Sequence, residues 1–352
     1  MPTTMSPPPA SSGSTGGGAE SRSTEIDVAR GGLVVIMLVY HCVLPNSCPE
    51  LEGIKTSIAF IHTAFLMMAG FLCGWHYLPH ARANPFHVSW RLMSRGLKVI
   101  AIFVIANAAL YAVGFHSVKV LMTECGNGME LVDNVVYSVN GHLFTFEILA
   151  YIGYFLILAS VAILRVELFF VVSVGIVALA GISPAATLYY VGCGFVGVLT
   201  AMMSREFSAT APSVRRSAHA CAVPVLLALQ VYGTFNWPHG VSPLSWMAIR
   251  WMETLAWIVC FVLMYRLLQK TPAAQLLPLF GRYSLFSYLG QMLIIVILSR
   301  VIAPMWDYNG SYLGYAAFWL TATTGTYCLV FACDRLRKAR PFVDSVYRAV
   351  FS

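Results

Sequence analysis

The sequence predicts an all-α, polytopic membrane protein with about ten transmembrane helices and both termini in the cytoplasm. Of its 352 residues, 58% are hydrophobic and only 11% are charged, whereas soluble domains average about 45–50% apolar and about 25% charged residues. A water-facing core cannot hide this surplus, because a soluble chain of this length still leaves about a quarter of its unfolded surface exposed. A soluble enzyme is therefore excluded, and lipid is the expected solvent.

Ten apolar stretches have about the 17–25 residues that a ~30 Å hydrocarbon layer requires. A segment that crosses lipid must satisfy its own backbone hydrogen bonds, so each stretch is predicted to be a helix. The stretches run from 27 to 44, 56 to 78, 96 to 115, 142 to 163, 166 to 182, 185 to 203, 218 to 235, 246 to 268, 283 to 302 and 312 to 333.

The two ends of the chain differ in composition from the middle. Residues 1–24 are mostly Pro, Ser, Thr and Gly, which provide too little apolar surface to offset the entropy of ordering, so a disordered tail is expected there. Residues 25–335 hold all ten stretches and predict one transmembrane domain without a clear internal repeat. Residues 336–352 predict a short basic cytoplasmic tail.

Positive charges determine the predicted orientation, because cytoplasmic loops are enriched in Lys and Arg. With the N-terminus inside, only four of the 22 Lys and Arg residues lie outside: Lys55, Lys119, Arg250 and Arg300. An even number of helices returns the C-terminus to the cytoplasm. The sequence thus predicts a multi-pass protein of the cytoplasmic (inner) membrane. Its net charge of +7 is spread over the helix ends, which argues against a nucleic-acid partner.

The cysteines and the glycine-rich segments predict packing. Most of the nine cysteines lie inside apolar stretches, where cysteine is usually a small buried hydrophobe. Cys48 and Cys125 both fall in predicted outer loops, so a disulfide between them stays open. No His or Cys cluster has metal-ligand spacing, and no metal is expected. Gly192-Cys-Gly-Phe-Val-Gly197 and Gly70-x-x-x-Gly74 predict close helix packing.

The first apolar stretch carries ionisable residues on one face. Arg30 and His41 are eleven residues apart, and eleven helical steps of about 100° return to within about 20° of the start after a rise of about 16 Å. Asp27 lies near the same face. Ionisable groups at membrane depth usually face a bundle interior or a wet cavity, so these residues are candidates for a site. Taken singly, Arg30 is also explained as a cytoplasmic anchor and His41 as an interfacial histidine.

This face resembles the opening of the membrane-bound acyltransferase family 3. Asp27-x-x-Arg30-Gly, followed after ten residues by Tyr40-His41, is similar to the family's first helix with its Arg-x10-His spacing. The segment Ala64-Phe-Leu-Met-Met-Ala-Gly-Phe-Leu72 resembles the family's Phe-rich stretch on helix 2.

The resemblance continues on the following segments. Arg91, Arg95 and Lys98 are similar to the family's Arg-x-x-Arg entrance to helix 3, with Lys98 as the second member of the pair that fits best. The segment Gly141-His-Leu-Phe-Thr-Phe-Glu147 resembles the His-Leu-Trp segment that opens helix 4.

The last matching segment lies near the C-terminal end of the resemblance, which covers residues 25 to 300 in the family's order. Gly281-Arg-Tyr-Ser-Leu-Phe-Ser-Tyr-Leu-Gly-Gln291 is similar to the motif Gly-Arg-x-Ser-x-x-x-Tyr-Leu-x-His. Gln291 stands where the family has histidine, so a proton-transfer role is not expected of it.

The resemblance implies an integral membrane O-acyltransferase that moves an acyl group from cytoplasmic acyl-CoA to a hydroxyl of a cell-envelope carbohydrate or related acceptor. Acyl-CoA is then the donor substrate, and no bound cofactor is implied. His41 in its neutral form would act as general base, with a covalent acyl-histidine as the alternative. Glu147 would be the second catalytic residue, at a depth near His41; its simpler interpretation is an interfacial carboxylate.

Cations near the inner surface fit the phosphates of such a donor, because Arg and Lys make charge-assisted hydrogen bonds. The same cations could instead meet anionic lipid headgroups. The donor-binding candidates are Arg30, Arg91, Arg95 and Lys98. The supporting candidates are Asp27, Tyr40, His142, Ser284, Tyr288 and Gln291.

Two other functions stay open. A transporter or flippase could line its path with the same polar face, although the sequence has neither paired hydrophobic segments broken by Gly or Pro nor internal symmetry. A succinyl-transferring relative that acts on periplasmic glucans also opens with an Asp-x-x-Arg-Gly helix. The acyl group, the acceptor and the oligomeric state are left open by the sequence.

Overall fold

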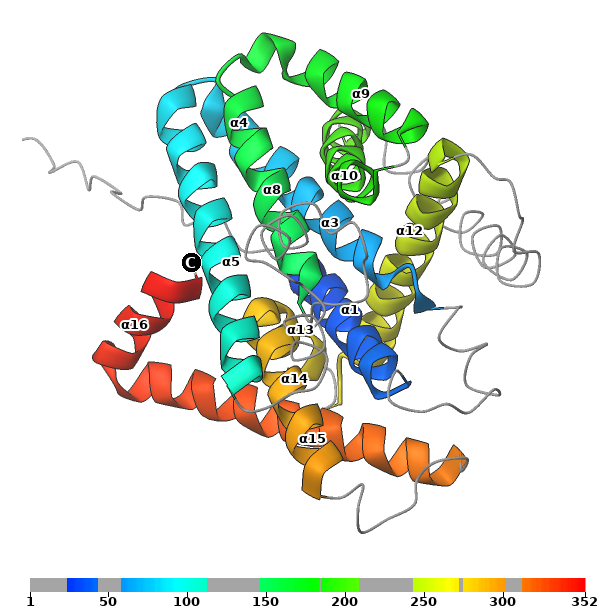
Figure 1. Ribbon diagram of the computed structural model, residues 1–352, viewed down its shortest axis with the longest axis vertical. Helices are drawn as coiled ribbons and strands as arrows, with labels where there is room; N and C mark the ends of the chain where they lie inside the picture. The colour runs from blue at the N-terminus through cyan, green and yellow to red at the C-terminus, as the bar shows by residue number, and fades with distance from the viewer. Residues whose placement is uncertain are drawn as a thin grey trace, which may run out of the picture.

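The computed structural model describes residues 24–43, 58–112, 146–183, 185–208, 243–271, 275–301 and 312–351. All regular secondary structure in these ranges is helical (Figure 1). The helices are α1 (Thr24–Val43), α3 (Ile61–Leu72), the π-helix η1 (Cys73–Tyr77), α4 (Leu78–Ala81), α5 (Pro85–Ala112), α8 (Glu147–Ala162), α9 (Val166–Ile182), α10 (Ala186–Ser208), α12 (Pro243–Leu268), α13 (Leu276–Arg282), α14 (Ser284–Val301), α15 (Tyr312–Ala339) and α16 (Pro341–Phe351).

Several of these helices are suited to a bilayer. Within the described ranges, α5, α10, α12 and α15 are long and apolar enough to cross a membrane. Helices α13 and α14 are a fifth candidate if this pair, bent by 99°, is one span, and α8 and α9 are shorter apolar helices. The chain is therefore an all-helical protein with the apolar helices of a membrane protein, as the sequence predicts.

The predicted stretches and the observed helices agree better in position than in number of spans. Nine of the ten stretches overlap a helix, and the stretch from 218 to 235 lies outside the described residues. The described helices account for four or five candidate spans instead of ten. Two physical reasons are that α8 and α9 are short and that the stretch from 56 to 78 is divided among α3, η1 and the start of α4.

Helix α5 begins eleven residues before the predicted stretch. The side-chain oxygen of Asn84 accepts a hydrogen bond of 3.1 Å from the backbone N–H of His87, which is the arrangement of a helix N-cap. Pro85 follows at the first helical position, where its missing N–H has no cost. The basic residues Arg91 and Arg95 therefore lie within a continuous helix, one turn apart.

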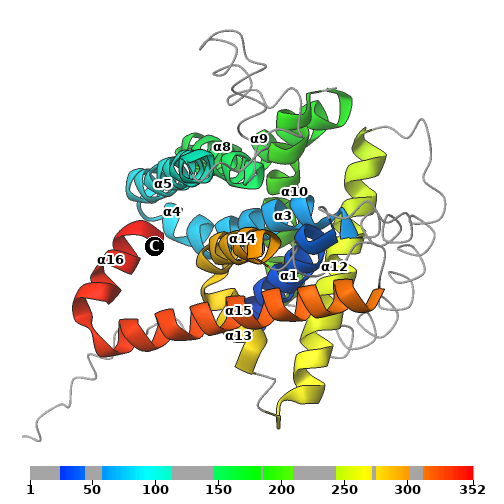
Figure 2. The ribbon, with the colours of Figure 1, turned by 60° about the horizontal axis from the view of Figure 1, so that its bottom comes forward.

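The C-terminal segment also differs from the expected basic tail. Helix α15 continues to Ala339, and Pro341 begins α16, which turns back toward α4 and α5 (Figure 2). Tyr347 lies 5.3 Å from the ring of Tyr283, and Phe351 lies 5.7 Å from the ring of Phe286. These aromatic contacts hold α16 against the bundle. The expected tail up to residue 23 and the loops with Cys48 and Cys125 lie outside the described residues.

Helix α1 contacts α3, α12, α13, α14 and α15 and is therefore the centre of one half of the bundle. It comes closest to α13, where two glycines leave no room for a side chain. A Cβ atom on Gly31 would lie 1.9 Å from the carbonyl oxygen of Leu277, and one on Gly281 would lie 1.7 Å from that of Asp27. The two backbones are thus in direct contact.

The same packing joins α3 to α10. A Cβ atom on Gly70 would lie 1.7 Å from the carbonyl oxygen of Gly194, and one on Gly197 would lie 1.9 Å from that of Met67. The glycine-rich segment of α10 therefore serves close helix packing, which confirms the prediction made from the sequence.

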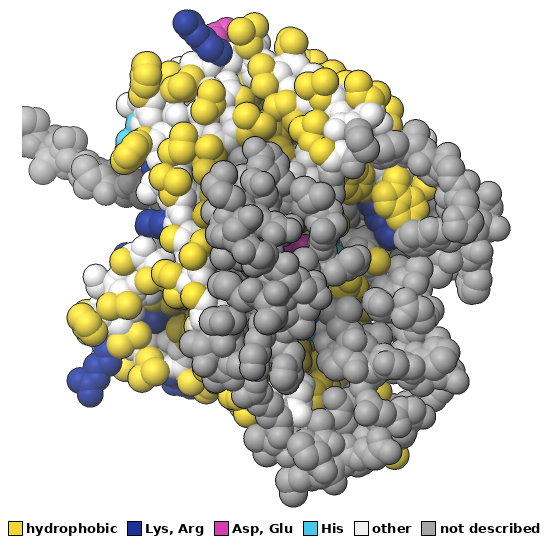
Figure 3. All heavy atoms as spheres, in the orientation of Figure 1, with side chains coloured by type: hydrophobic (Ala, Val, Ile, Leu, Met, Phe, Trp, Pro, Cys, Tyr) yellow, Lys and Arg dark blue, Asp and Glu magenta, His cyan; other side chains and the backbone are white. Residues whose placement is uncertain are grey.

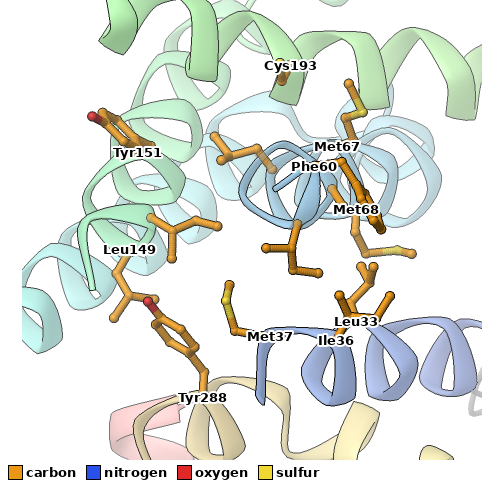
Figure 4. Packing of buried hydrophobic residues seen from close by; sticks show 14 of the residues in the cluster. Leu33, Ile36, Met37, Phe60, Met67, Met68, Leu149, Tyr151, Cys193 and Tyr288 are labelled. Atoms are coloured by element: carbon orange, nitrogen blue, oxygen red, sulfur yellow. The ribbon is translucent and has the colours of Figure 1, made fainter. Parts of the chain in front are cut away.

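Apolar side chains fill the interior and also cover the outside. Figure 4 shows Met37 of α1, Leu149 of α8 and Tyr288 of α14 turned toward one another in the largest buried cluster. On the surface, large hydrophobic side chains such as Ile105 and Val171 are exposed by 67% and 63%. Figure 3 shows such side chains over much of the face formed by α5, α8 and α9. This exposed surface indicates a lipid environment.

The glycine contact between α3 and α10 can be tested by Gly197→Ala. The added methyl group must push the two backbones apart, and such overpacking typically costs about 1–3 kcal/mol. We expect a lower Tm in detergent. Gly175→Ala is the matched control, since no atom lies within 4 Å of its would-be Cβ. Equal Tm values for the two variants would contradict the close packing.

Candidate functional site

Arg30 and His41 both face helix α14. The Arg30 guanidinium donates a hydrogen bond of 2.5 Å to the hydroxyl of Ser284, and the His41 ring lies 6.1 Å from the ring of Tyr288. Ser284 and Tyr288 are one helical turn apart. The two ionisable residues of α1 therefore share one face, as their spacing in the sequence predicts.

His41 is half-buried and lies among aromatic rings. Its ring is 5.6 Å from that of Tyr40, and Tyr40 is 4.9 Å from the ring of His62. His41 also interacts electrostatically with His62. The Nε2 atom of His41 is buried and has no hydrogen-bond partner among the described residues. A buried polar atom left unpaired costs about 1–3 kcal/mol, so a ligand or a water molecule is its expected partner.

Glu147 is the first residue of α8 and is half-buried. The preceding residue, Phe146, has φ 72° and ψ 15°, a left-handed conformation that costs a side chain about 1–3 kcal/mol. Its ring packs at 5.5 Å against Tyr288. Tyr288 therefore lies near His41 and near Phe146, the residue that precedes Glu147.

Gln291 is the most deeply buried of the supporting candidates. Gln291 has 0% of its surface exposed. Neither the oxygen nor the nitrogen of its side-chain amide has a hydrogen-bond partner in the described part of the chain. It follows Ser284 and Tyr288 at helical spacing, seven and three residues on, so the three lie on one face of α14. An apolar residue would avoid the cost of this unpaired amide, which suggests that the amide is kept for a partner.

A pocket of about 520 Å³ opens beside Arg30, where α1, α5, α13, α15 and α16 meet. Six cationic and two acidic side chains line it, a formal excess of four positive charges. We call it the basic pocket; its lining residues are Arg30, Arg95, Arg282, Tyr283, Asp334, Arg337, Lys338, Asp344, Tyr347, Arg348 and Phe351.

The basic pocket contains two of the four expected donor-binding residues. Arg30 and Arg95 line it, whereas Arg91 and Lys98 do not. Arg95 donates a hydrogen bond of 2.5 Å to the hydroxyl of Tyr77, and Arg91 lies 5.8 Å from the ring of the same tyrosine. Tyr77 belongs to the π-helix η1, an element that is frequent at functional sites.

Four cations of the basic pocket were not assigned from the sequence. Arg282 lies in the Gly-Arg segment at the end of α13, and Arg337, Lys338 and Arg348 lie in the segment expected to be a tail. The sequence does contain a signal for a helix in this segment: Pro341, followed by Asp344 and Arg348. Proline is favoured at the first position of a helix, and an acidic residue four positions before a basic one stabilises a helix.

The remaining site candidates are placed as follows. Asp27 is buried, with its backbone against Gly281, and Tyr40 lies between His41 and His62. His142 lies outside the described residues. Within the described ranges, no three His, Cys, Asp or Glu residues gather as they would around a metal ion.

Arg250, one of the four cations expected on the outer side of the membrane, is buried in the bundle with 5% of its surface exposed. Its guanidinium donates a hydrogen bond of 2.7 Å to Glu253 and lies 4.2 Å from the ring centre of Trp246. Burial is stabilised here by a partner three residues away, which a count of Lys and Arg residues does not consider.

The described residues form apolar helices, a basic pocket and a cluster of His and Tyr rings around the buried Nε2 atom of His41. In comparisons with known proteins, the chain matches no family model, no curated protein and no solved structure.

The buried pair of Arg250 and Glu253 predicts asymmetric mutant stabilities. Glu253→Ala leaves a buried guanidinium without its carboxylate, which typically costs about 3–5 kcal/mol. The double variant Arg250→Met/Glu253→Leu removes both charges and should recover most of the stability. Thermal unfolding in detergent measures both. A double variant as unstable as the single one would show that the pair itself is required.

Proposed function

We propose that the chain is an integral membrane O-acyltransferase that moves an acyl group from cytoplasmic acyl-CoA to a hydroxyl of a cell-envelope carbohydrate or related acceptor. The proposal includes ten spans, both termini in the cytoplasm and a location in the inner membrane. It follows from the resemblance of the sequence motifs to membrane-bound acyltransferase family 3.

One observation carries the proposal: a single face of α1 joins a basic pocket to a histidine whose Nε2 atom is buried. Arg30 lines the pocket, and His41 lies about 16 Å further along the helix with its Nε2 atom unpaired. Acyl-CoA has the matching chemistry, with several phosphates at one end of an extended arm and a thioester at the other. A phosphate group at Arg30 would leave the thioester within reach of His41.

The proposed reaction needs one base and one leaving group. The Nε2 atom of neutral His41 takes the proton of the acceptor hydroxyl while the oxygen attacks the thioester carbonyl. The new C–O bond forms, the C–S bond breaks, and the proton passes from His41 to the departing CoA thiolate. Tyr288, whose ring lies 6.1 Å from that of His41, is a positioning residue. Glu147 is the second catalytic residue, a carboxylate that favours the imidazolium formed on proton abstraction. The covalent acyl-histidine route remains the second mechanism.

The bend between α13 and α14 favours the transporter as the second candidate function. Broken membrane helices often line the substrate sites of transporters, and these two helices meet at 99°. The described residues contain one such pair, whereas many transporters repeat it symmetrically. Acyl transfer by the purified protein decides between the two functions, since a carrier performs none.

His41→Ala tests the catalytic role. We expect acyl transfer to fall by at least about a hundredfold, the lower limit for loss of a general base, while the Tm in detergent changes little. The measurement is release of CoA thiol by the purified protein in the presence of an acceptor extract. His87→Ala is the control, because His87 is exposed on α5. Retained transfer in His41→Ala would remove His41 from the mechanism.

Arg30→Ala tests donor binding. Loss of a charge-assisted hydrogen bond of about 1.5–3 kcal/mol should raise the KM for acyl-CoA about 10–100-fold. The control is Arg335→Ala, since Arg335 is exposed and lies against Phe331 outside the basic pocket. If KM is unchanged in Arg30→Ala, Arg30 is only a membrane anchor.

A further inference from the structure

The carboxylates of the basic pocket are already engaged by some of its cations. Asp334 accepts hydrogen bonds from Tyr283 at 2.8 Å and from Lys338 at 2.6 Å. Asp344 of α16 pairs with Arg337 at 2.6 Å and with Arg348 at 2.6 Å. Hydrogen bonds from Arg337 hold the pKa of Asp344 below its ordinary value, so this carboxylate is charged at neutral pH. Asp344 thus acts as an internal anion in the pocket.

The same wall of the pocket presents planar side chains. The guanidinium of Arg337 lies 3.9 Å from the ring centre of Tyr347 and 5.2 Å from that of Tyr283. Tyr347 also stacks on Phe351 at 4.8 Å. Guanidinium groups next to aromatic rings can hold both a phosphate and a planar base, because the cation binds the anion and the ring offers a stacking surface.

We propose that the basic pocket is a nucleotide site whose wall is the C-terminal helix α16, and that the ligand's phosphates displace Asp344 from Arg337 and Arg348. The phosphates take the place of Asp344 at Arg337 and Arg348, in a pocket that Arg30, Arg95 and Arg282 also line. The base stacks on the face of Tyr347 that Arg337 covers in this structure. That this nucleotide is the adenosine part of acyl-CoA rests on the proposed function. Helix α16 then contributes directly to the choice of donor.

The chemistry of the ligand has two sources, since phosphates also occur on lipid headgroups. The geometry favours the nucleotide, because the Arg337 guanidinium of the pocket lies beside two aromatic rings, those of Tyr347 and Tyr283. A headgroup has no planar base and gains nothing from Tyr347. A base-free phosphate compound and a lipid therefore serve as comparison ligands.

The experiment measures binding by isothermal titration calorimetry on the full-length protein in uncharged detergent. The probes are adenosine 3′,5′-bisphosphate, inorganic pyrophosphate and short-chain phosphatidylglycerol. We expect the bisphosphate to bind at least about tenfold more tightly than the other two, which corresponds to the gain from stacking one base. Equal affinity for pyrophosphate or phosphatidylglycerol would overturn the nucleotide assignment.

Two variants of α16, each with a matched control, sharpen the test. Arg348→Ala should weaken binding of the bisphosphate about tenfold, whereas Arg340→Ala, which removes an equal charge outside the pocket, should leave it within about twofold. Tyr347→Ala should weaken the bisphosphate and not pyrophosphate, with Val346→Ala on the exposed face as its control. Equal losses in a variant and its control would contradict a role for α16.

Asp344→Asn distinguishes an internal anion from a purely structural residue, because the two predict opposite changes in affinity for the bisphosphate. Removing the internal anion frees two guanidinium groups, so the bisphosphate should bind several-fold more tightly. Unchanged or weaker binding would overturn the displacement of Asp344.

His41→Ala should leave nucleotide binding intact. Nucleotide binding without any acyl transfer would contradict the proposed function alone, and transfer without binding of the bisphosphate would contradict the nucleotide site alone.

Discussion

The direct contact of the α1 and α13 backbones is the constraint on which the site depends. Gly31 and Gly281 each lie against a carbonyl oxygen of the other helix, so no side chain separates the two. This contact holds Arg30 beside Ser284, immediately after the bend, and holds Arg282 at the wall of the basic pocket. In lipid, where water gives no hydrophobic drive between helices, such small-residue packing is the main source of association.

The polar groups of the interior are divided between the two ends of one helix face. At the Arg30 end, charges gather around a pocket and neutralise one another only in part. At the His41 end, polar atoms are enclosed among aromatic rings, and His41 has a nitrogen without a partner among the described residues. Each arrangement is costly in a low-dielectric medium. A ligand that is charged at one end and weakly polar at the other would relieve both costs.

Local sequence patterns predicted the helical class, the glycine packing of α10 and the common face of Arg30 and His41. These follow from hydropathy and helical periodicity alone. The sequence did not predict the burial of Arg250 or the folding back of α16. Helix α16 depends on Tyr283 and Phe286, which become its neighbours only in the folded chain. Arg250 is enclosed by Trp246 and Glu253 of its own helix, and counting cations by side of the membrane does not consider such local pairs.

The bend at Tyr283 has a mechanical consequence. The backbone N–H of Tyr283 still donates to Leu279 at 3.2 Å, and its carbonyl accepts from Ser287 at 2.7 Å. The hydrogen-bonded ladder therefore runs up to this residue from both sides, so the change of direction costs little. It lets Arg282 line the basic pocket while Ser284, two residues further on, accepts the hydrogen bond of Arg30.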